Sequence, residues 1–387
     1  MTARHPTGNG LRVAVTGAGG FIGGRLAALL ALQPGVAEVR VLVRRRGPGQ
    51  AAAVLARLDN PAQVQAALQG CDAVVHCAFD YYDLPANLVI AQVLAEAAIL
   101  TGARLVHLSS AVVHEPLPDG ALDEGAPAAP DGDAYKDTKI AIEERLLASA
   151  RDHGLDLVVL QPTIVYGPRG GAWTDSPVRE LLTGEVLLPA QGEGLCNAVF
   201  VDDVCQAAIA ALTAHIAPGE RFLVSGAAPV TWREFLGAYE RMLGTRSLRL
   251  SDLPPPAGHP GSGKGPALRM GAAGALRRLI AVRLGAAGRS RLSLLLQRAR
   301  KAVRGRRAYL PNGAKHALYA ARCHVRIDKA RRSLGYEPQF DLDRGMEATE
   351  RYVRQAYAGI ARAAGPQHGD AQDPVLPHGA PSADQAG

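Results

Sequence analysis

The sequence is poor in the features that mark secreted, membrane-spanning and zinc-binding proteins. Its five cysteines are scattered and odd in number, which argues against a disulfide framework or a zinc site. The polar N-terminus, residues 1–10, has no apolar signal core, and we find no apolar run approaching the ~18 residues of a membrane-spanning helix. We therefore expect a protein of the reducing cytoplasm, with no metal site.

Acidic residues are missing from one long stretch of a chain that is rich in basic residues. Residues 253–327 hold sixteen Lys and Arg but no Asp or Glu, so the net charge of +7 is local. Leucines interleave with these arginines at partly helical spacing. Three interpretations stay open: a solvated face of an amphipathic helix, an interfacial helix at anionic lipid, or a lid for a phosphorylated substrate. Nucleic acid is not expected, because the stretch has only Tyr309 and Tyr319 for base stacking.

Short β-branched runs alternate with helical stretches through the first half of the chain. This alternation predicts right-handed β–α–β crossovers and a parallel sheet. We expect an α/β fold, a Rossmann-type doubly wound parallel sheet with a smaller C-terminal substrate-binding lobe. The expected strands are 11–15, 38–43, 73–77, 104–108 and 155–160, and the expected helices are 25–32, 87–101, 135–150 and 200–212, the last capped by Asp202 or Asp203.

The loop after the first strand carries Gly17, Gly20 and Gly23. Glycine permits a tight turn and a close approach of the backbone to a pyrophosphate, and the following helix offers free N–H groups. The usual G-x-G-x-x-G is not met, because Ile22 stands where its last glycine belongs. The position between a strand and a helix nevertheless predicts a dinucleotide-binding loop.

Tyr135 and Lys139 are four residues apart, so they share one face of the expected helix. An ammonium beside a phenol lowers the phenol pKa from its ordinary value of about 10. Such a tyrosine can exchange a proton with a hydroxyl while hydride moves to or from a nicotinamide. Ser110 ends the strand at 104–108, where its hydroxyl can polarise a carbonyl oxygen. His76 and His107, in or beside buried strands, are expected in the core.

Taken together, these motifs resemble those of the extended short-chain dehydrogenase/reductases, specifically the NAD-dependent epimerase/dehydratase family. The resemblance implies that Tyr135 is the proton donor or acceptor, that Lys139 binds the nicotinamide ribose, and that Ser110 is catalytic. The matching pieces occur in family order over about residues 11–354: TGAGGFIG (16–23), HCA (76–78), HLSSAVVH (107–114), YKDTK (135–139), QPTIVYGPR (161–169), VFVDDV (199–204) and KARRSLGYEP (329–338).

The resemblance also implies a bound nicotinamide dinucleotide. Arg44 and Arg45 stand where the family has the acid that grips the ribose of NAD, and a guanidinium can bind a 2′-phosphate instead, so NADP is favoured over NAD. Either Arg57 or Asp59 is expected at the adenine. The remaining residues expected at the cofactor are Gly17, Gly20, Phe21, Ile22, Gly23, Ala78, Tyr135, Lys139, Pro162 and Val165.

Departures from the family pattern bear on the substrate. Ala111 and Val112 replace the Asp-Glu pair of family dehydratases and cannot exchange protons, so a sugar 4,6-dehydratase is disfavoured. Cys196 replaces an arginine that meets sugar-nucleotide phosphates in many members. His114 and Arg169 are candidate substrate contacts, although a spacer and a solvated loop arginine explain them equally well.

We predict an NAD(P)-dependent oxidoreductase or epimerase acting at a secondary alcohol or ketone carbon, in the first place of a nucleotide-activated or lipid-linked sugar. An NADPH-dependent ketoreductase on a sterol- or polyketide-like substrate and a non-catalytic NADP-binding sensor are the alternatives. The expected partners are a small-molecule substrate, in the first place a phosphorylated sugar, and a second copy of the chain. The basic insert leaves contact with the inner face of the membrane open.

The expected organisation has four parts. A flexible N-terminus (1–10) precedes the NAD(P)-binding domain (11–220), in which 171–198 form a substrate loop. The substrate lobe (221–363) carries the basic insert (253–327). The tail (364–387) lacks hydrophobic periodicity, so it is expected to be disordered.

Overall fold

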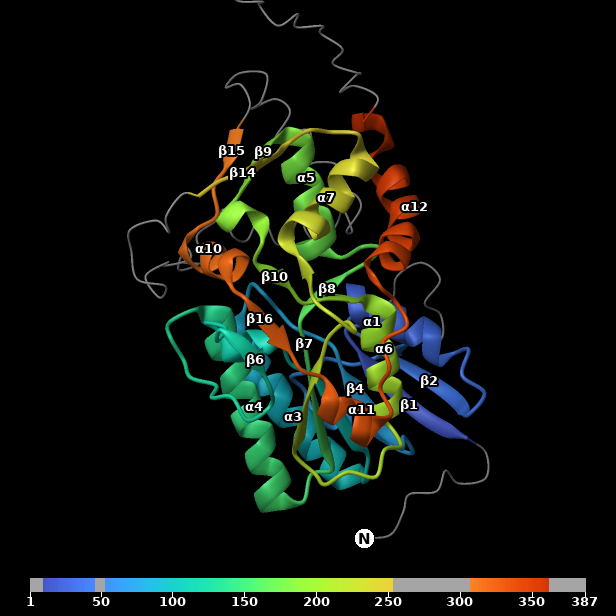
Figure 1. Cartoon of the computed structure of the whole chain (residues 1–387). Coiled ribbons are helices and arrows are strands. Elements are labelled where there is room, and N and C mark those ends of the chain that lie inside the picture. The colour runs from blue at the N-terminus through green and yellow to red at the C-terminus, as the bar shows by residue number, and fades with distance from the viewer. Residues whose placement is uncertain (1–9, 46–52, 253–306, 362–387) are drawn as a thin grey trace, which may run out of the picture.

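The computed structural model describes residues 10–45, 53–252 and 307–361 (Figure 1). Its centre is a seven-stranded sheet in which every pair of neighbouring strands is parallel. The predicted Rossmann-type sheet is therefore confirmed. In spatial order the strands are β12 (Glu220–Val224), β7 (Leu157–Pro162), β5 (Arg104–Leu108), β4 (Ala73–His76), β1 (Leu11–Thr16), β2 (Val36–Val43) and β3 (Val54–Leu55).

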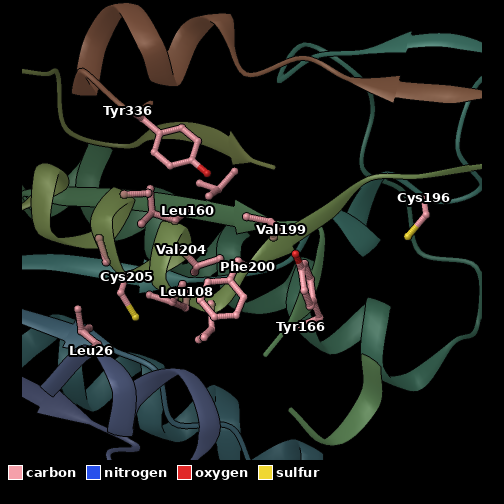
Figure 2. Packing of buried hydrophobic residues seen from close by; sticks show 14 of the residues in the cluster. Leu26, Leu108, Leu160, Tyr166, Cys196, Val199, Phe200, Val204, Cys205 and Tyr336 are labelled. Carbon is pink, nitrogen blue, oxygen red and sulfur yellow. The ribbon is translucent and has the colours of Figure 1, made fainter. Parts of the chain in front are cut away.

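Helices cover both faces of this sheet, and each face has its own core. Successive residues of a strand point to opposite faces: Val13 and Val15 pack with Leu26 of α1 (Phe21–Leu30), whereas Ala14 packs in the other cluster. Figure 2 shows part of the first cluster. The first face also carries α6 (Val201–Ala211), and the second carries α2 (Pro61–Leu68), α3 (Leu84–Thr101) and α4 (Ala134–His153).

Helix α3 corrects one expectation from the sequence. Its 18 residues have a hydropathy of 1.6, so by length and composition alone it is a candidate membrane span. In the structure α3 contacts α2 and α4 and buries Ala91, Leu94 and Ala98 against the sheet. One face of α3 therefore lies in the core of the doubly wound sheet, with 39% of the helix buried.

The second lobe is assembled from several separate stretches of the chain (Figure 1). Its three-stranded parallel sheet has β9 between β14 and β15. The elements of this lobe are α5 (Ser176–Thr183), β9 (Gly184–Leu188), α7 (Trp232–Leu243), β14 (Leu248–Leu250), β15 (Arg307–Tyr309), α10 (Gly313–Ala320) and α12 (Leu342–Ala361).

Short strand pairs and one further helix join the two lobes. The pairs are β6 (Gly120–Leu122) with β16 (Cys323–Val325), β8 (Ile164–Tyr166) with β11 (Ala198–Phe200), and β10 (Leu195–Cys196) with β13 (Val230–Thr231). Helix α11 (Asp328–Leu334) returns to the first lobe, where it contacts α6 and β12.

The predicted boundary between the NAD(P)-binding domain and the substrate lobe is residue 220. Strand β12 starts at the predicted limit of residue 220 and is the edge strand of the large sheet, which therefore extends to Val224. Residues 1–9, most of the basic insert and the tail lie outside the described residues, so their predicted roles stay predictions.

The two acids at the start of α6 do not cap it, contrary to the expectation. Phe200 is the N-cap, and both acids lie in the first turn. Asp202 instead forms a two-point ion pair with Arg25 of α1, both contacts at 2.6 Å. Asp203 accepts hydrogen bonds from the backbone of Gln339 and Phe340 at 2.8 and 3.2 Å, which ties α6 to the segment leading into α12.

Candidate active site

The glycine loop lies between β1 and α1 and fits a dinucleotide in its backbone geometry. Gly17 has φ +70°, and a Cβ there would lie 2.6 Å from the backbone nitrogen of Ala78. A Cβ on Gly23 would lie 2.6 Å from the oxygen of Gly17. Gly20 is the N-cap of α1 and supplies no side-chain cap, so backbone N–H groups of the first turn are left for an anion.

The predicted catalytic residues converge at the carboxyl edge of the sheet, beside this loop. Asp133 caps α4 by accepting from the backbone nitrogens of Tyr135 and Lys136, at 3.0 and 2.9 Å. The Tyr135 phenol hydrogen-bonds to the Ser110 hydroxyl. Lys139, one turn further along α4, donates from Nζ to the oxygen of Leu108 at 3.0 Å. The structure therefore brings Ser110, Tyr135 and Lys139 together; the i, i+4 spacing predicted this for Tyr135 and Lys139.

The electrostatics of Tyr135 differ from the expectation. Burial raises the pKa of the Tyr135 phenol above its ordinary value, and the hydrogen bond from Ser110 only partly opposes this. Burial also lowers the pKa of Lys139 to about 8. The Lys139 ammonium lies 5.9 Å from the centroid of the Tyr135 ring and donates a hydrogen bond to the oxygen of Leu108. Desolvation therefore affects the pKa of Tyr135 more than the charge of Lys139 does. The phenol therefore holds its proton at neutral pH and is ready to donate it.

A buried polar network supports α4 behind the catalytic residues. Glu143, 3% exposed, accepts from the Ser109 hydroxyl and from Gln161 Nε2, the latter at 3.0 Å to both carboxylate oxygens. His114 Nε2 lies 3.1 Å from Gln161 Oε1, and its Nδ1 lies 3.3 Å from the oxygen of Pro127. His114 is 5% exposed, so its placement agrees with a spacer and not with a substrate contact.

Two stacked histidines lie beneath this edge, in the core as expected. The rings of His76 and His107 are 5.3 Å apart between centroids. His76 Nδ1 bonds to the Thr16 hydroxyl at 2.9 Å, whereas both ring nitrogens of His107 are buried without a hydrogen-bond partner in the described part of the chain. Burial, reinforced by the charge of Lys139, lowers the pKa of His76 to about 3 and that of His107 well below its ordinary value.

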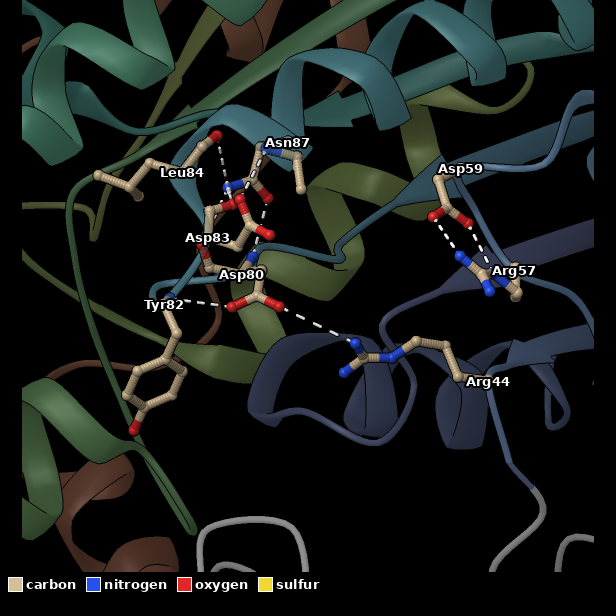
Figure 3. Close-up of polar contacts among 9 residues, drawn as sticks. Arg44, Arg57, Asp59, Asp80, Tyr82, Asp83, Leu84 and Asn87 are labelled. Carbon is tan, nitrogen blue, oxygen red and sulfur yellow. Dashed lines mark hydrogen bonds and ion pairs between the residues drawn. The ribbon is translucent and has the colours of Figure 1, made fainter. Parts of the chain in front are cut away.

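The arginines predicted to select the cofactor directly follow β2, and Figure 3 shows Arg44. Arg44 is 72% exposed, and its guanidinium is 3.9 Å from the Asp80 carboxylate. Arg45 is exposed beside it. Arg57 and Asp59, the two candidates for the adenine, hold each other in a two-point contact at 3.0 and 2.7 Å.

Four further residues singled out from the sequence differ in their exposure. Pro162 ends β7 and is buried, and Val165 lies in β8. Arg169 is exposed, with φ +73°. Cys196, where many family members carry a phosphate-binding arginine, is fully buried.

Sequence reasoning did not single out the aromatic residues beside Tyr135. Phe79 and Tyr81, from the segment between β4 and α3, lie 5.2 and 5.6 Å from the Tyr135 ring, measured between centroids. The Lys139 ammonium lies 4.5 Å from the centroid of Phe79. The signal was present as FDYY, directly after the HCA motif.

Comparison with known proteins agrees with this site. Residues 13–225 match the model of the NAD dependent epimerase/dehydratase family. A dTDP-glucose 4,6-dehydratase of Streptomyces niveus is 34% identical over 185 residues, which are 41% of this chain and 55% of that protein. A 2-alkyl-3-oxoalkanoate reductase of Shewanella oneidensis is 28% identical over 248 residues, 57% of this chain and 63% of that one. The chain thus spans less than two thirds of the length of these relatives.

Solved structures show the same fold over most of the chain. A dTDP-glucose 4,6-dehydratase of Streptomyces venezuelae, solved with NAD and TYD bound, superposes with a TM-score of 0.64 at 21% identity, covering 90% of this chain and 98% of that one. The family model and this fold bear out the resemblance that the motifs suggested. The chain belongs to the NAD-dependent epimerase/dehydratase family.

Proposed function

We propose that the chain is an NAD(P)-dependent oxidoreductase that acts at a secondary alcohol or ketone carbon. The observation that carries the proposal is the convergence of Ser110, Tyr135 and Lys139 at the edge of the sheet where the glycine loop opens. Ligands of open parallel sheets bind at this edge. A non-catalytic sensor has no need of a proton-relay set.

In ketone reduction, Ser110 and Tyr135 act on the substrate oxygen, and Lys139 acts on Tyr135. The glycine loop of Gly17, Gly20 and Gly23 would hold a nicotinamide dinucleotide, which in its reduced form would supply a hydride for the carbonyl carbon. Ser110 donates a hydrogen bond to the carbonyl oxygen, which gains electron density as the C=O π bond breaks. Tyr135 gives that oxygen its phenolic proton and recovers one from solvent. The protonated Lys139 stabilises the phenolate in between.

The surroundings of Ser110 favour ketone reduction over sugar dehydration. Ala111 and Val112 follow it in a short 3-10 helix, Ala111 being 6% exposed. Neither side chain can protonate a leaving hydroxyl or remove an α-proton. The Shewanella oneidensis relative, named as a reductase of 3-oxoalkanoates, supports the same reaction type.

A nucleotide-sugar epimerase is the second candidate. It is favoured by the likeness to dTDP-glucose 4,6-dehydratases in sequence and fold. An epimerase returns the hydride to the same substrate and retains its dinucleotide, whereas a reductase exchanges it at every turnover. Dinucleotide released from the purified protein, identified by mass, therefore separates the two candidates.

NADP is the cofactor we propose on the basis of Arg44 and Arg45. Both are exposed at the end of β2, where a 2′-phosphate is read in such sheets. Replacing Arg44 by Ala should weaken NADPH binding at least tenfold and leave NADH binding within twofold, measured by titration calorimetry. Equal losses for both dinucleotides would show that Arg44 does not select the phosphate.

The proposed homodimer is tested separately by analytical ultracentrifugation.

The decisive experiment is hydride transfer to a panel of ketones and nucleotide sugars. Tyr135→Phe should lower kcat by about 10²- to 10⁴-fold, the usual contribution of a positioned acid or base. Tyr82→Phe, at an exposed tyrosine of the neighbouring segment, is the matched control and should leave the rate unchanged. A protein that binds dinucleotide but reduces nothing, with Tyr135→Phe silent, would be a sensor instead.

A further inference from the structure

Two tyrosines, Tyr81 and Tyr135, meet at the edge of the sheet that carries the proposed catalytic residues, and this inference rests on the proposed function. Their rings stack nearly parallel, 5.6 Å apart between centroids and with 16° between their planes. A hydrogen bond joins the two phenols, and another joins Tyr135 to Ser110. Three hydroxyls therefore form one hydrogen-bonded chain, which runs from Ser110 through Tyr135 to Tyr81.

The turn that carries Tyr81 is held in place by a buried amide. Asn87, 2% exposed, accepts from the backbone nitrogen of Asp80 at 2.8 Å and donates to the oxygens of Asp80 and Asp83 at 2.9 and 3.2 Å (Figure 3). The backbone N–H of Tyr82 donates to the Asp80 carboxylate at 2.9 Å. These contacts fix the backbone on both sides of Tyr81, so the turn itself sets the position of its hydroxyl.

The outer phenol of this chain takes up negative charge more easily than the inner one. Tyr81 is 62% exposed, whereas Tyr135 is half-buried, and water stabilises an ionised group. Burial raises the pKa of both phenols, but their shared hydrogen bond lowers the pKa of Tyr81 and raises that of Tyr135. When the pair loses one proton, the charge therefore rests on Tyr81, and the proton that remains is held by Tyr135.

Tyr135 must be supplied with a new proton after each ketone is reduced. Lys139 is 5% exposed, and its Nζ donates to the oxygen of Leu108 and faces the ring of Phe79, 4.5 Å from the centroid. Of Lys139 and Tyr81, only Tyr81 is exposed to water. A hydroxyl both donates and accepts hydrogen bonds, so it can give up one proton while it takes another.

We propose that Tyr81 acts through Tyr135 as a positioning residue, whose hydroxyl replaces the proton that Tyr135 gives to the substrate oxygen. As the O–H bond of Tyr135 breaks, the O–H bond of Tyr81 breaks as well, and a new O–H bond forms on Tyr135. The Tyr81 oxygen then takes a proton from water. One solvent proton thus enters the chain for each hydride that the reductant of the proposed function supplies, and both tyrosines end as they began.

The test measures kcat and KM for the reduction of ethyl acetoacetate by NADPH, with the full chain. Tyr81→Phe removes the hydroxyl and keeps the ring. It should lower kcat about 10- to 100-fold, the loss expected for a hydrogen bond to an oxygen that becomes charged, and leave KM within about twofold. Tyr82→Phe, at an exposed tyrosine of the same turn, is the matched control and should behave as wild type.

The solvent isotope effect reports on the proton transfer itself. In wild type two O–H bonds change together, so kcat should follow a curve when it is plotted against the deuterium fraction of the solvent. In Tyr81→Phe only the proton of Tyr135 moves, and the plot should be straight. A loss of packing alone would leave the shape of this plot unchanged, and a straight plot for both proteins would contradict the proposal.

The outcomes separate this inference from the proposed function. An unchanged kcat in Tyr81→Phe, or a loss seen in Tyr81→Leu and not in Tyr81→Phe, would overturn the role of the hydroxyl and leave the oxidoreductase intact. Epimerisation of UDP-glucose without net reduction would do the same, because the substrate then returns its proton to Tyr135 and none is drawn from solvent. A wild-type chain that reduces no ketone and turns over no nucleotide sugar would overturn both proposals.

Discussion

Among single residues, Gly17 has the least room for a side chain in the cofactor loop. A Cβ there would lie within 2.6 Å of the Ala78 backbone, and its φ of +70° disfavours other residues. Gly17→Ala should therefore lower the free energy of unfolding by about 1–3 kcal/mol. Gly19, where a Cβ would meet nothing within 4 Å, is the control, and Gly19→Ala should change it by less than about 0.5 kcal/mol. Similar losses in urea titrations of both variants would refute the crowding argument.

A second prediction at the residue scale concerns Glu143. Its charge opposes the lowering of the Lys139 pKa by burial. Glu143→Gln removes that charge, so the pKa of Lys139 should fall further below about 8 and the ammonium should be lost at lower pH. The alkaline limb of the kcat/KM profile should then move down by about half to one pH unit. Glu144→Gln, on the exposed neighbour, should leave the profile in place; an unmoved profile in Glu143→Gln would assign Glu143 a structural role alone.

At the scale of elements, the connection from β4 to α3 depends on Asn87. Asn87→Ala removes the amide that pairs with partly buried backbone groups of Asp80 and Asp83, which should cost about 1–3 kcal/mol of stability. It should also loosen the turn that carries Tyr81. Gln92→Ala, further along α3 and hydrogen-bonded to Glu96, should cost less than about 0.5 kcal/mol. Differential scanning calorimetry of both variants measures these costs, and an Asn87→Ala protein as stable as wild type would disprove this account of the turn.

For the whole molecule, the stacked histidines make stability sensitive to acid. In the unfolded chain, His107 is protonated below about its ordinary pKa of 6.5. In the folded chain, burial holds the pKa of His107 well below that value. This contribution to stability is therefore lost as the pH falls. His107→Phe removes this titrating group. The free energy of unfolding of the variant, relative to that of wild type, should therefore rise by about 1.4 kcal/mol for each pH unit below 6.5.

Urea unfolding at pH 7, 6 and 5 measures this gain, and exposed His215→Gln is the control that should show none. The comparison with wild type is essential. Burial raises the pKa of Glu115 to about 7 and that of Asp203 to about 6, so the folded state takes up those protons more readily and partly offsets the histidines. A constant difference between His107→Phe and wild type across this range would contradict the prediction.

Local pattern was enough to predict the parallel sheet, the glycine loop and the joint placement of Tyr135 and Lys139. The reason is that these features depend on short-range periodicity: alternation of apolar residues, glycines at a strand end, and two residues four apart on one helix. The i, i+4 spacing alone puts the phenol and the ammonium on one face. The expected family follows from the same local motifs in their order.

Contacts between distant segments were decided only by the tertiary structure. The pKa of Tyr135 rises because the folded chain desolvates the phenol, and no spacing along α4 reveals that burial. Asp202 pairs with Arg25, 177 residues away, so it does not cap its own helix. His114, in the 3-10 helix after β5, is hydrogen-bonded to Gln161 of β7. Tyr81 reaches Tyr135 because parallel strands bring their carboxyl ends, and the loops that follow them, to the same edge of the sheet.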